Sequence, residues 1–79
     1  MASLYILKLV DNSYYVGSTG NLTQRLNNHY NGEVKSTKHK LPFVLIYTEN
    51  YNTKSEAQKR EYQIKRWKKR VAIERLLKK

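Results

Sequence analysis

The sequence predicts a small α+β domain, in which a three-stranded, at least partly antiparallel sheet is flanked by helices in the order β-β-α-β-α-α. Three observations predict it. Two strand-like segments, 4–10 and 14–19, are joined by a short polar turn. A capped helical pattern follows, and a continuous apolar run at 43–47 then predicts a third strand. The remaining chain has two helical patterns of different phase, so we expect one domain spanning residues 1–79.

The first two segments predict a β-hairpin. Leu4 to Val10 is dense in Leu, Ile, Tyr and Val, which is typical of a mostly buried strand. Asp11-Asn12-Ser13 is a tight-turn sequence, and Tyr14 to Thr19 forms the returning strand. The sequence does not fix the register of this pair, so it leaves open whether Tyr5 and Tyr15 share a face.

The next segment predicts a helix with recognisable ends. Asn21 is expected to cap it, with Gln24 as the capping-box partner. Gly32 can adopt the left-handed conformation that ends it. Arg25 and His29 are four residues apart, so they lie along one edge of this helix.

Residues 33–41 predict an exposed, basic loop that can contact phosphates, and Pro42 closes it. Phe43 to Tyr47 is the strongest strand signal in the chain. Because its apolar residues are continuous, we expect this strand at the centre of the sheet.

The second long helix carries an unusual carboxylate. Thr53 or Ser55 can cap this helix. At about 100° per residue, Glu61 projects within about 60° of both Ala57 and Ile64. A carboxylate there is costly unless a basic side chain or a bound metal ion meets it. Further along the chain the apolar residues recur in a different helical phase, and a single straight helix would not keep both apolar stripes on one face. We therefore expect a break near residues 68–70 before a short last helix.

Composition narrows the function classes. Sixteen Lys and Arg face six Asp and Glu, a formal net charge of +10. This charge favours polyanionic partners, with nucleic acid first and an anionic membrane surface second; the alternative is a merely basic small protein. The absence of cysteine excludes disulfides and thiolate zinc sites, and it fits a reducing, cytoplasmic location. No apolar stretch suits a signal peptide or a membrane span.

Five side chains have the chemistry to act on a phosphodiester: Tyr5, Tyr15, Arg25, His29 and Glu61. A tyrosine is a poor base at neutral pH, although nearby positive charge lowers its pKa. An arginine can stabilise the charge that develops on a phosphate. A histidine can relay a proton or bind phosphate, and a carboxylate suits Mg²⁺.

Each of these residues also has a plainer interpretation. Strand tyrosines are usually packing residues, and Arg25 alone is more often a solvated helix arginine. His29 alone is more often a surface or cap histidine. Two basic runs are candidate nucleic-acid contacts, although such runs are usually solvated: Lys35, Lys38, His39 and Lys40, then Lys65, Arg66, Lys68, Lys69 and Arg70. Trp67 and Tyr62 can stack on unpaired bases, or Trp67 can belong to the core.

Taken together, these residues resemble the GIY-YIG endonuclease family, especially its small stand-alone bacterial members. The first motif of the family corresponds to Ser3-Leu4-Tyr5, and the second to Tyr15-Val16-Gly17. The family's later segments match in order along nearly the whole chain: Ser18-Thr19, Asn21-Leu22, Arg25-Leu26, His29, residues 42–49, Glu56-Ala57, Arg60-Glu61 and Ile64-Lys65. The chain departs from the family in keeping only the tyrosine of the first motif, and in having no asparagine after Asn52.

The resemblance implies a function. Glu61 would bind one Mg²⁺, or Mn²⁺ in its place, and Tyr5 would act as general base. Tyr15 would position the water or phosphate, Arg25 would bind the phosphate and His29 would assist. The chain would then be a monomeric endonuclease acting on DNA, as in DNA repair, directed by substrate shape or a partner protein. The alternatives are a nucleic-acid-binding module of the same fold with little activity, and a basic protein-interaction adaptor.

Overall fold

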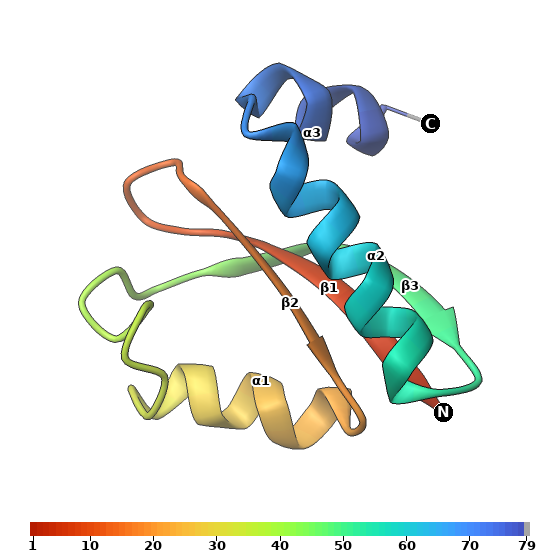
Figure 1. The fold of residues 1–79 in the computed structure, drawn as a ribbon. Coiled ribbons are helices and arrows are strands. Elements are labelled where there is room, and N and C mark those ends of the chain that lie inside the picture. The colour runs from red at the N-terminus through yellow and green to blue at the C-terminus, as the bar shows by residue number, and fades with distance from the viewer. Residues whose placement is uncertain (79) are drawn as a thin grey trace.

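The computed structural model describes residues 1–78. Three strands form one antiparallel sheet in the order β2-β1-β3 (Figure 1). The strands are β1 (Ala2–Lys8), β2 (Tyr14–Thr19) and β3 (Val44–Tyr51), and the helices are α1 (Leu22–Tyr30), α2 (Lys54–Trp67) and α3 (Arg70–Leu77). The α+β fold and the order of elements predicted from the sequence are confirmed. Within the described residues, no helix is long and apolar enough to cross a membrane.

The sheet lies between two helical layers. Helix α1 covers one face, whereas α2 and α3 lie on the other (Figure 1). Leu4 and Ile6 of β1 pack toward Ile64 of α2, and Tyr5 and Leu7 pack in the cluster that α1 covers. This alternation follows from the two-residue period of a strand. Because β1 is buried on both faces, the middle of its sequence, Leu4 to Leu7, consists of large hydrophobic and aromatic residues with no polar-apolar alternation.

The position of the third strand differs from the expectation. The run beginning at Phe43 was expected at the sheet centre, but β3 is an edge strand and β1 is central. Val44 and Leu45 are exposed. An apolar run identifies a strand, but which strand is central depends on long-range pairing that the run does not encode.

The register of the hairpin settles the question of the two tyrosines. Leu7 pairs with Tyr15, and Tyr5 pairs with Gly17. Tyr5 therefore lies on the same face of the sheet as Tyr15, and their ring centroids are 6.3 Å apart. The predicted turn is also present, with Asn12 in the left-handed region at φ 69°.

The helix ends follow the predicted chemistry. The Asn21 side chain accepts a hydrogen bond from the Gln24 amide at 3.1 Å, and Thr53 caps α2 by accepting from the Glu56 amide at 3.2 Å. Helix α2 ends at Trp67, and its C-cap residue Lys68 has a φ of 57°, so the predicted break at 68–70 is present. Lys69 is the N-cap residue of α3, and its side chain makes no capping hydrogen bond.

The loop after α1 is less exposed than expected. Lys35, Lys38 and His39 are on the surface, as predicted. Val34 and Thr37, however, are buried, with exposed fractions of 8% and 0%. The polar sequence of the loop conceals these anchors, and Thr37 brings a hydroxyl into the interior next to α1.

An ionic cluster fixes the edge strand to α2. Glu49 accepts hydrogen bonds from the hydroxyls of Tyr47 and Tyr51, and its Oε1 lies 3.0 Å from Arg60 Nε. Burial alone would raise the pKa of Glu49, but these hydrogen bonds hold it below its usual value. Arg60 directly precedes Glu61, so this cluster helps to fix the part of α2 that carries the candidate carboxylate.

Candidate active site

A polar pocket of about 300 Å³ lies at the end of β2, where the edge of the sheet is open. It contains side chains from both faces of the sheet. Tyr5, Tyr15 and Arg25 come from the α1 side, and Glu61 comes from α2 on the other side. The remaining lining residues are Gly17, Ser18, Thr19, Lys54 and Gln58. Such a site requires an edge strand, here β2, because side chains from the two faces of the sheet can approach each other only past its free edge.

The Tyr5 phenol lies directly against the backbone of β2. A Cβ atom at Gly17 would be 2.5 Å from the Tyr5 hydroxyl oxygen and 2.6 Å from Cζ. No side chain fits there, so the glycine of the second motif makes room for the tyrosine of the first motif. The hairpin register places these two residues opposite each other, and this position therefore requires glycine.

A directional hydrogen-bond chain extends from this phenol into the interior. Arg25 Nε donates to the Tyr5 oxygen at 3.3 Å, and His29 Nε2 lies 3.0 Å from the same oxygen. On the other side of the ring, His29 Nδ1 lies 2.9 Å from Thr37 Oγ1, which donates to the carbonyl of Val34. Thr37 therefore accepts from Nδ1–H, and Nε2 is left to accept the phenolic proton of Tyr5.

The environment keeps the side chains of this hydrogen-bond chain uncharged, with the exception of Arg25. Burial raises the pKa of Tyr5, and the hydrogen bond from Arg25 only partly offsets this rise. Nearby positive charge was expected to lower this pKa, but desolvation of the buried phenol outweighs it. Burial, with the Arg25 charge close by, lowers the pKa of His29 to about 4. The hydrogen bond to Tyr5 raises the pKa of Arg25. At neutral pH the histidine is therefore an uncharged proton acceptor.

His29 does not lie where a phosphate can reach it. Its side chain is fully buried behind Tyr5 and edge-on to both Tyr5 and Tyr15. It is therefore neither a surface histidine nor a phosphate contact, and of the two functions considered from the sequence only proton relay is compatible with its position.

Glu61 is the carboxylate of the pocket. Its place in an apolar stripe predicted that a basic side chain or a metal ion would meet it, and a basic side chain does. Ser18 Oγ donates to Oε1 at 2.5 Å, and Lys65 Nζ is 2.6 Å from Oε2. Within residues 1–78, no group of three potential ligands forms a metal cluster. Mg²⁺ does not need one, since it binds through one or two carboxylates together with waters and phosphate oxygens. A single partly exposed carboxylate in a polar pocket fits that ion, with Lys65 as a competitor for Oε2.

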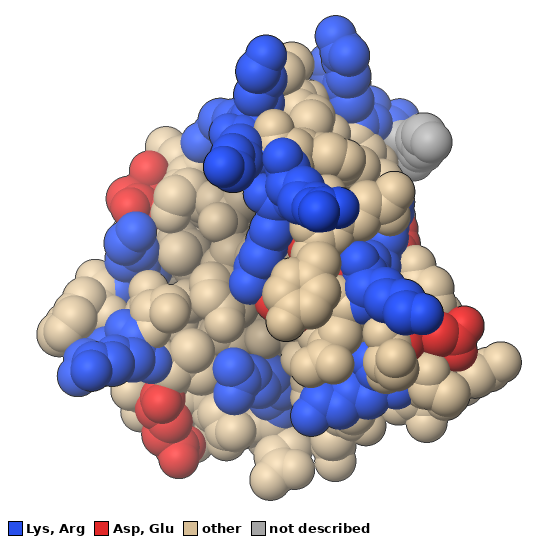
Figure 2. Space-filling view, in the orientation of Figure 1, with Lys and Arg blue, Asp and Glu red and all other residues tan. Residues whose placement is uncertain are grey.

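The five candidate catalytic residues thus lie close together. The two basic runs, in contrast, lie on separate parts of the surface. Lys and Arg side chains gather over the end of α2 and the start of α3, with Asp and Glu mostly at the margins of this face (Figure 2). Lys65 lies beside Glu61, and Lys40 is 3.3 Å from Asp11. Trp67 packs against the core under Arg60, whereas Tyr62 is 65% exposed.

Sequence reasoning missed several residues of the site. Lys54 and Gln58 precede Glu61 at helical spacing on the same face of α2, a signal that could have identified them. Ser18 and Thr37 carried no such signal, because their contacts to Glu61 and His29 join distant segments.

Comparisons with known proteins identify the family of this fold. Residues 1–75 match the family model described as the GIY-YIG catalytic domain. A UPF0213 protein of Staphylococcus haemolyticus is 48% identical over 63 residues, covering 78% of this chain and 77% of that protein. One from Clostridium perfringens is 46% identical over 67 residues, 84% of this chain and 72% of that protein. The solution NMR structure of a UPF0213 protein from Bacillus halodurans superposes with a TM-score of 0.65 at 34% identity, covering 99% of this chain and 84% of that one.

Proposed function

The chain belongs to the GIY-YIG catalytic domain family, which implies a nuclease-type function, and on that premise we propose that it is a metal-dependent endonuclease that hydrolyses phosphodiester bonds in DNA. The observation that carries the proposal is the meeting of Tyr5, Arg25 and Glu61 around one open polar pocket. The site offers a proton acceptor, a cation and a carboxylate, which are the groups that such a hydrolysis requires.

Arg25 is the phosphate-binding group. Its Nε donates to Tyr5 at 3.3 Å, which fixes the side chain at the pocket. The remaining guanidinium N–H groups are suited to the oxygens of a phosphate, where a fixed positive charge stabilises the negative charge of the transition state. Tyr15 lies beside the same pocket and orients the attacking water or the phosphate.

Tyr5 is the general base, and His29 receives the proton. Burial disfavours a free phenolate, so Tyr5 must lose its own proton as it takes one from water. With the His29 tautomer in which Nδ1 donates to Thr37, the Tyr5 hydroxyl donates to Nε2, 3.0 Å away. The water proton passes to the Tyr5 oxygen while the phenolic proton passes to His29, so no free phenolate forms. The imidazolium is only transient, because burial and the Arg25 charge hold the pKa of His29 at about 4, and the histidine returns the proton as the step is completed.

Glu61 is the residue that would hold the divalent ion, Mg²⁺ with Mn²⁺ as a substitute. When bound, the ion supplies Lewis-acid stabilisation of the phosphate and its leaving oxygen. Ser18 holds the carboxylate in place through Oε1. Substrate choice rests on the shape of the nucleic acid or on a partner protein, because the pocket carries no groove-reading element.

One observation favours the second candidate, a nucleic-acid-binding module with little catalysis. Lys65 Nζ is 2.6 Å from Glu61 Oε2, so the ammonium group competes with an ion for this carboxylate. If the ion pair outcompeted metal, the chain would bind nucleic acid and leave it uncut.

A cleavage assay separates the two candidates. Labelled single-stranded, duplex, flap and branched DNA are incubated with the protein in Mg²⁺, in Mn²⁺ and in chelator, beside Glu61→Gln. Glu56→Gln is the matched control, since Glu56 is an exposed carboxylate in the first turn of the same helix. We expect metal-dependent cutting that Glu61→Gln abolishes and Glu56→Gln retains. Cutting by Glu61→Gln at the parental rate would disprove the assignment, and binding without cutting on every substrate would favour the binding module.

A further inference from the structure

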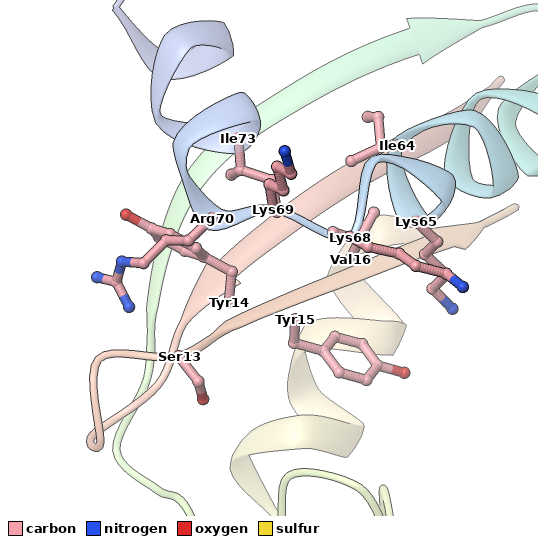
Figure 3. A pocket seen from close by; sticks show the side chains of 10 residues that line it. All are labelled: Ser13, Tyr14, Tyr15, Val16, Ile64, Lys65, Lys68, Lys69, Arg70 and Ile73. Carbon is pink, nitrogen blue, oxygen red and sulfur yellow. The ribbon is translucent and has the colours of Figure 1, made fainter.

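A second groove, of about 410 Å³, lies beside the candidate active site, between β2 and the corner where α2 meets α3 (Figure 3). Its apolar lining includes Tyr14 of β2, Ile64 of α2 and Ile73 of α3. This lining is mostly carbon surface, unlike that of the polar pocket around Glu61. The proposed chemistry does not use this groove.

Four cationic residues also line the groove, and none of its lining residues is acidic: Lys65, Lys68, Lys69 and Arg70. Two of them are engaged. Arg70 donates to the Asn12 carbonyl and lies over the Tyr14 ring at 4.6 Å, so it closes the hairpin end of the groove. Lys65 pairs with Glu61. Within the described part of the chain, Lys68 and Lys69 have no salt bridge.

The backbone at this corner adds to the positive character. Lys68 is in the left-handed conformation, which ends α2 and turns the chain into α3. Lys69 caps α3 without a side-chain hydrogen bond, and no acidic residue is in the first turn of α3. The start of α3, with the positive end of its dipole, therefore lies at the rim of the groove beside the ammonium groups of Lys68 and Lys69.

The groove is continuous with the candidate active site. Tyr15 lines both cavities, and Lys65, which lines the groove, contacts Glu61 of the pocket. In Figure 3, Lys65 and Lys68 extend toward the side on which Tyr15 lies, whereas Arg70 lies at the Tyr14 end. A strand bound in the groove would thus pass Tyr15 on its way to the pocket.

We propose that this groove binds an unpaired nucleotide next to the scissile phosphate, so that the preferred substrate class is nucleic acid with a single-stranded segment at the cut. The proposal rests on the proposed function and deepens it. The base lies against the apolar and aromatic lining, and Lys68 and Lys69, whose side chains extend in different directions (Figure 3), each contact one of the backbone phosphates that flank the nucleotide. Aromatic and apolar contact with the face of a base, combined with ammonium groups on the backbone, is the usual chemistry of single-strand binding.

The charges favour this occupant over others. An apolar peptide would leave the ammonium groups without partners, and a base-paired nucleotide has no free face to offer the lining. An unpaired nucleotide satisfies both the carbon surface and the cationic rim. The formal net charge of +10 favours the same polyanion.

Binding without metal tests the groove separately from catalysis. The wild-type chain in chelator is titrated into fluorescein-labelled oligothymidylate, an abasic oligomer of the same length and a duplex, and affinity is read by fluorescence anisotropy. A gel checks that each oligomer remains intact. We expect oligothymidylate to bind at least about five-fold more tightly than the abasic oligomer, the lower limit of what stacking one base supplies. Equal affinity for the two oligomers would overturn the proposal.

A double variant, Lys68→Gly with Lys69→Ser, removes both free charges without opposing the fold. Glycine suits the left-handed conformation at position 68, and serine suits the N-cap of α3. We expect weaker binding of the single strand and a salt slope shallower by about 1.4, since each phosphate contact contributes about 0.7. Lys59→Ala with Lys78→Ala is the control, because both lysines are exposed and line neither cavity.

The outcomes separate the two proposals. If the double variant binds single strands as well as the control does, the groove is not the site. If it loses affinity for duplex and single strand equally, the lysines serve only general phosphate attraction and the inference fails. The proposed function depends instead on Mg²⁺-dependent cutting that Glu61→Gln abolishes, which these binding measurements do not involve.

Discussion

The hydroxyl of Tyr5 lies 3.0 Å from Nε2 of His29, although 24 residues separate them in the sequence. This contact joins the central strand to α1 and makes the buried Tyr5 phenol the pocket end of a buried hydrogen-bond chain. The chain continues through Thr37 to the loop after α1. The chemistry available at the pocket therefore depends on residues that do not line it.

Gly17→Ala should displace the Tyr5 phenol. The added Cβ would be 2.5 Å from its hydroxyl oxygen. The contact is with a buried aromatic ring and not with a flexible side chain, so it cannot be relieved by a small side-chain movement. We expect a stability loss of about 1–3 kcal/mol and a cleavage rate lower by about 100-fold, as for small displacements of reacting groups. Gly20→Ala is the control, because its Cβ would meet nothing within 4 Å. Urea unfolding and single-turnover cleavage measure the two effects, and equal rates in both variants would contradict the steric argument.

Thr37→Val should leave Nδ1–H of His29 buried without an acceptor. The substitution keeps the shape of the side chain but removes its hydroxyl, so we expect a loss of about 1–3 kcal/mol in the free energy of unfolding. It should also change the His29 ring ¹⁵N shifts, since Thr37 determines which nitrogen carries the proton. Thr37→Ser restores the hydroxyl and should restore the wild-type ¹⁵N pattern. An unchanged pattern in Thr37→Val would show that the hydroxyl does not select the tautomer.

His29 should make the fold sensitive to acid. Its pKa is about 4 in the native chain and 6.5 in the unfolded chain, so the unfolded state binds a proton first as the pH falls. The free energy of unfolding should therefore be unaffected by His29 above pH 6.5 and decrease between about pH 6.5 and 4. The loss attributable to this residue is about 3 kcal/mol. Urea unfolding of wild type and His29→Gln across this range should show a shallower pH dependence in the variant. Parallel curves would contradict the buried, neutral state.

Lys65→Met should strengthen metal binding to the free protein. Lys65 Nζ is 2.6 Å from Glu61 Oε2, so its removal frees one carboxylate oxygen and a negative charge. An ion pair at this helical spacing contributes about 0.3–0.5 kcal/mol, so we expect Mn²⁺ affinity, measured by calorimetry without nucleic acid, to rise about two-fold. Lys59→Met is the control on the same helix. Weaker Mn²⁺ binding in Lys65→Met than in this control would show that Lys65 supports the metal site.

The sequence by itself determined the elements and the chemistry they carry. Asn21 was identifiable as a helix cap, and Thr53 as one of two candidates with Ser55, because capping depends on residues only a few positions apart. The break near Lys68 was visible in the phase of the apolar residues. The placement of Glu61 in an apolar stripe indicated that a positive group would meet it, and Lys65 does, within one helical turn.

Only the tertiary structure decided how these elements meet. The sheet order placed β1, not the more apolar run at 43–47, at the centre, because pairing between distant strands decides it. The register placed Tyr5 and Tyr15 on one face, and a shift of one residue would have separated them. Burial of His29 and Thr37, which lowers the histidine pKa, depends on how α1 and its loop pack on the sheet. A local pattern can identify a strand or a cap, but pKa values and shared pockets arise from groups that are neighbours only once the chain is folded.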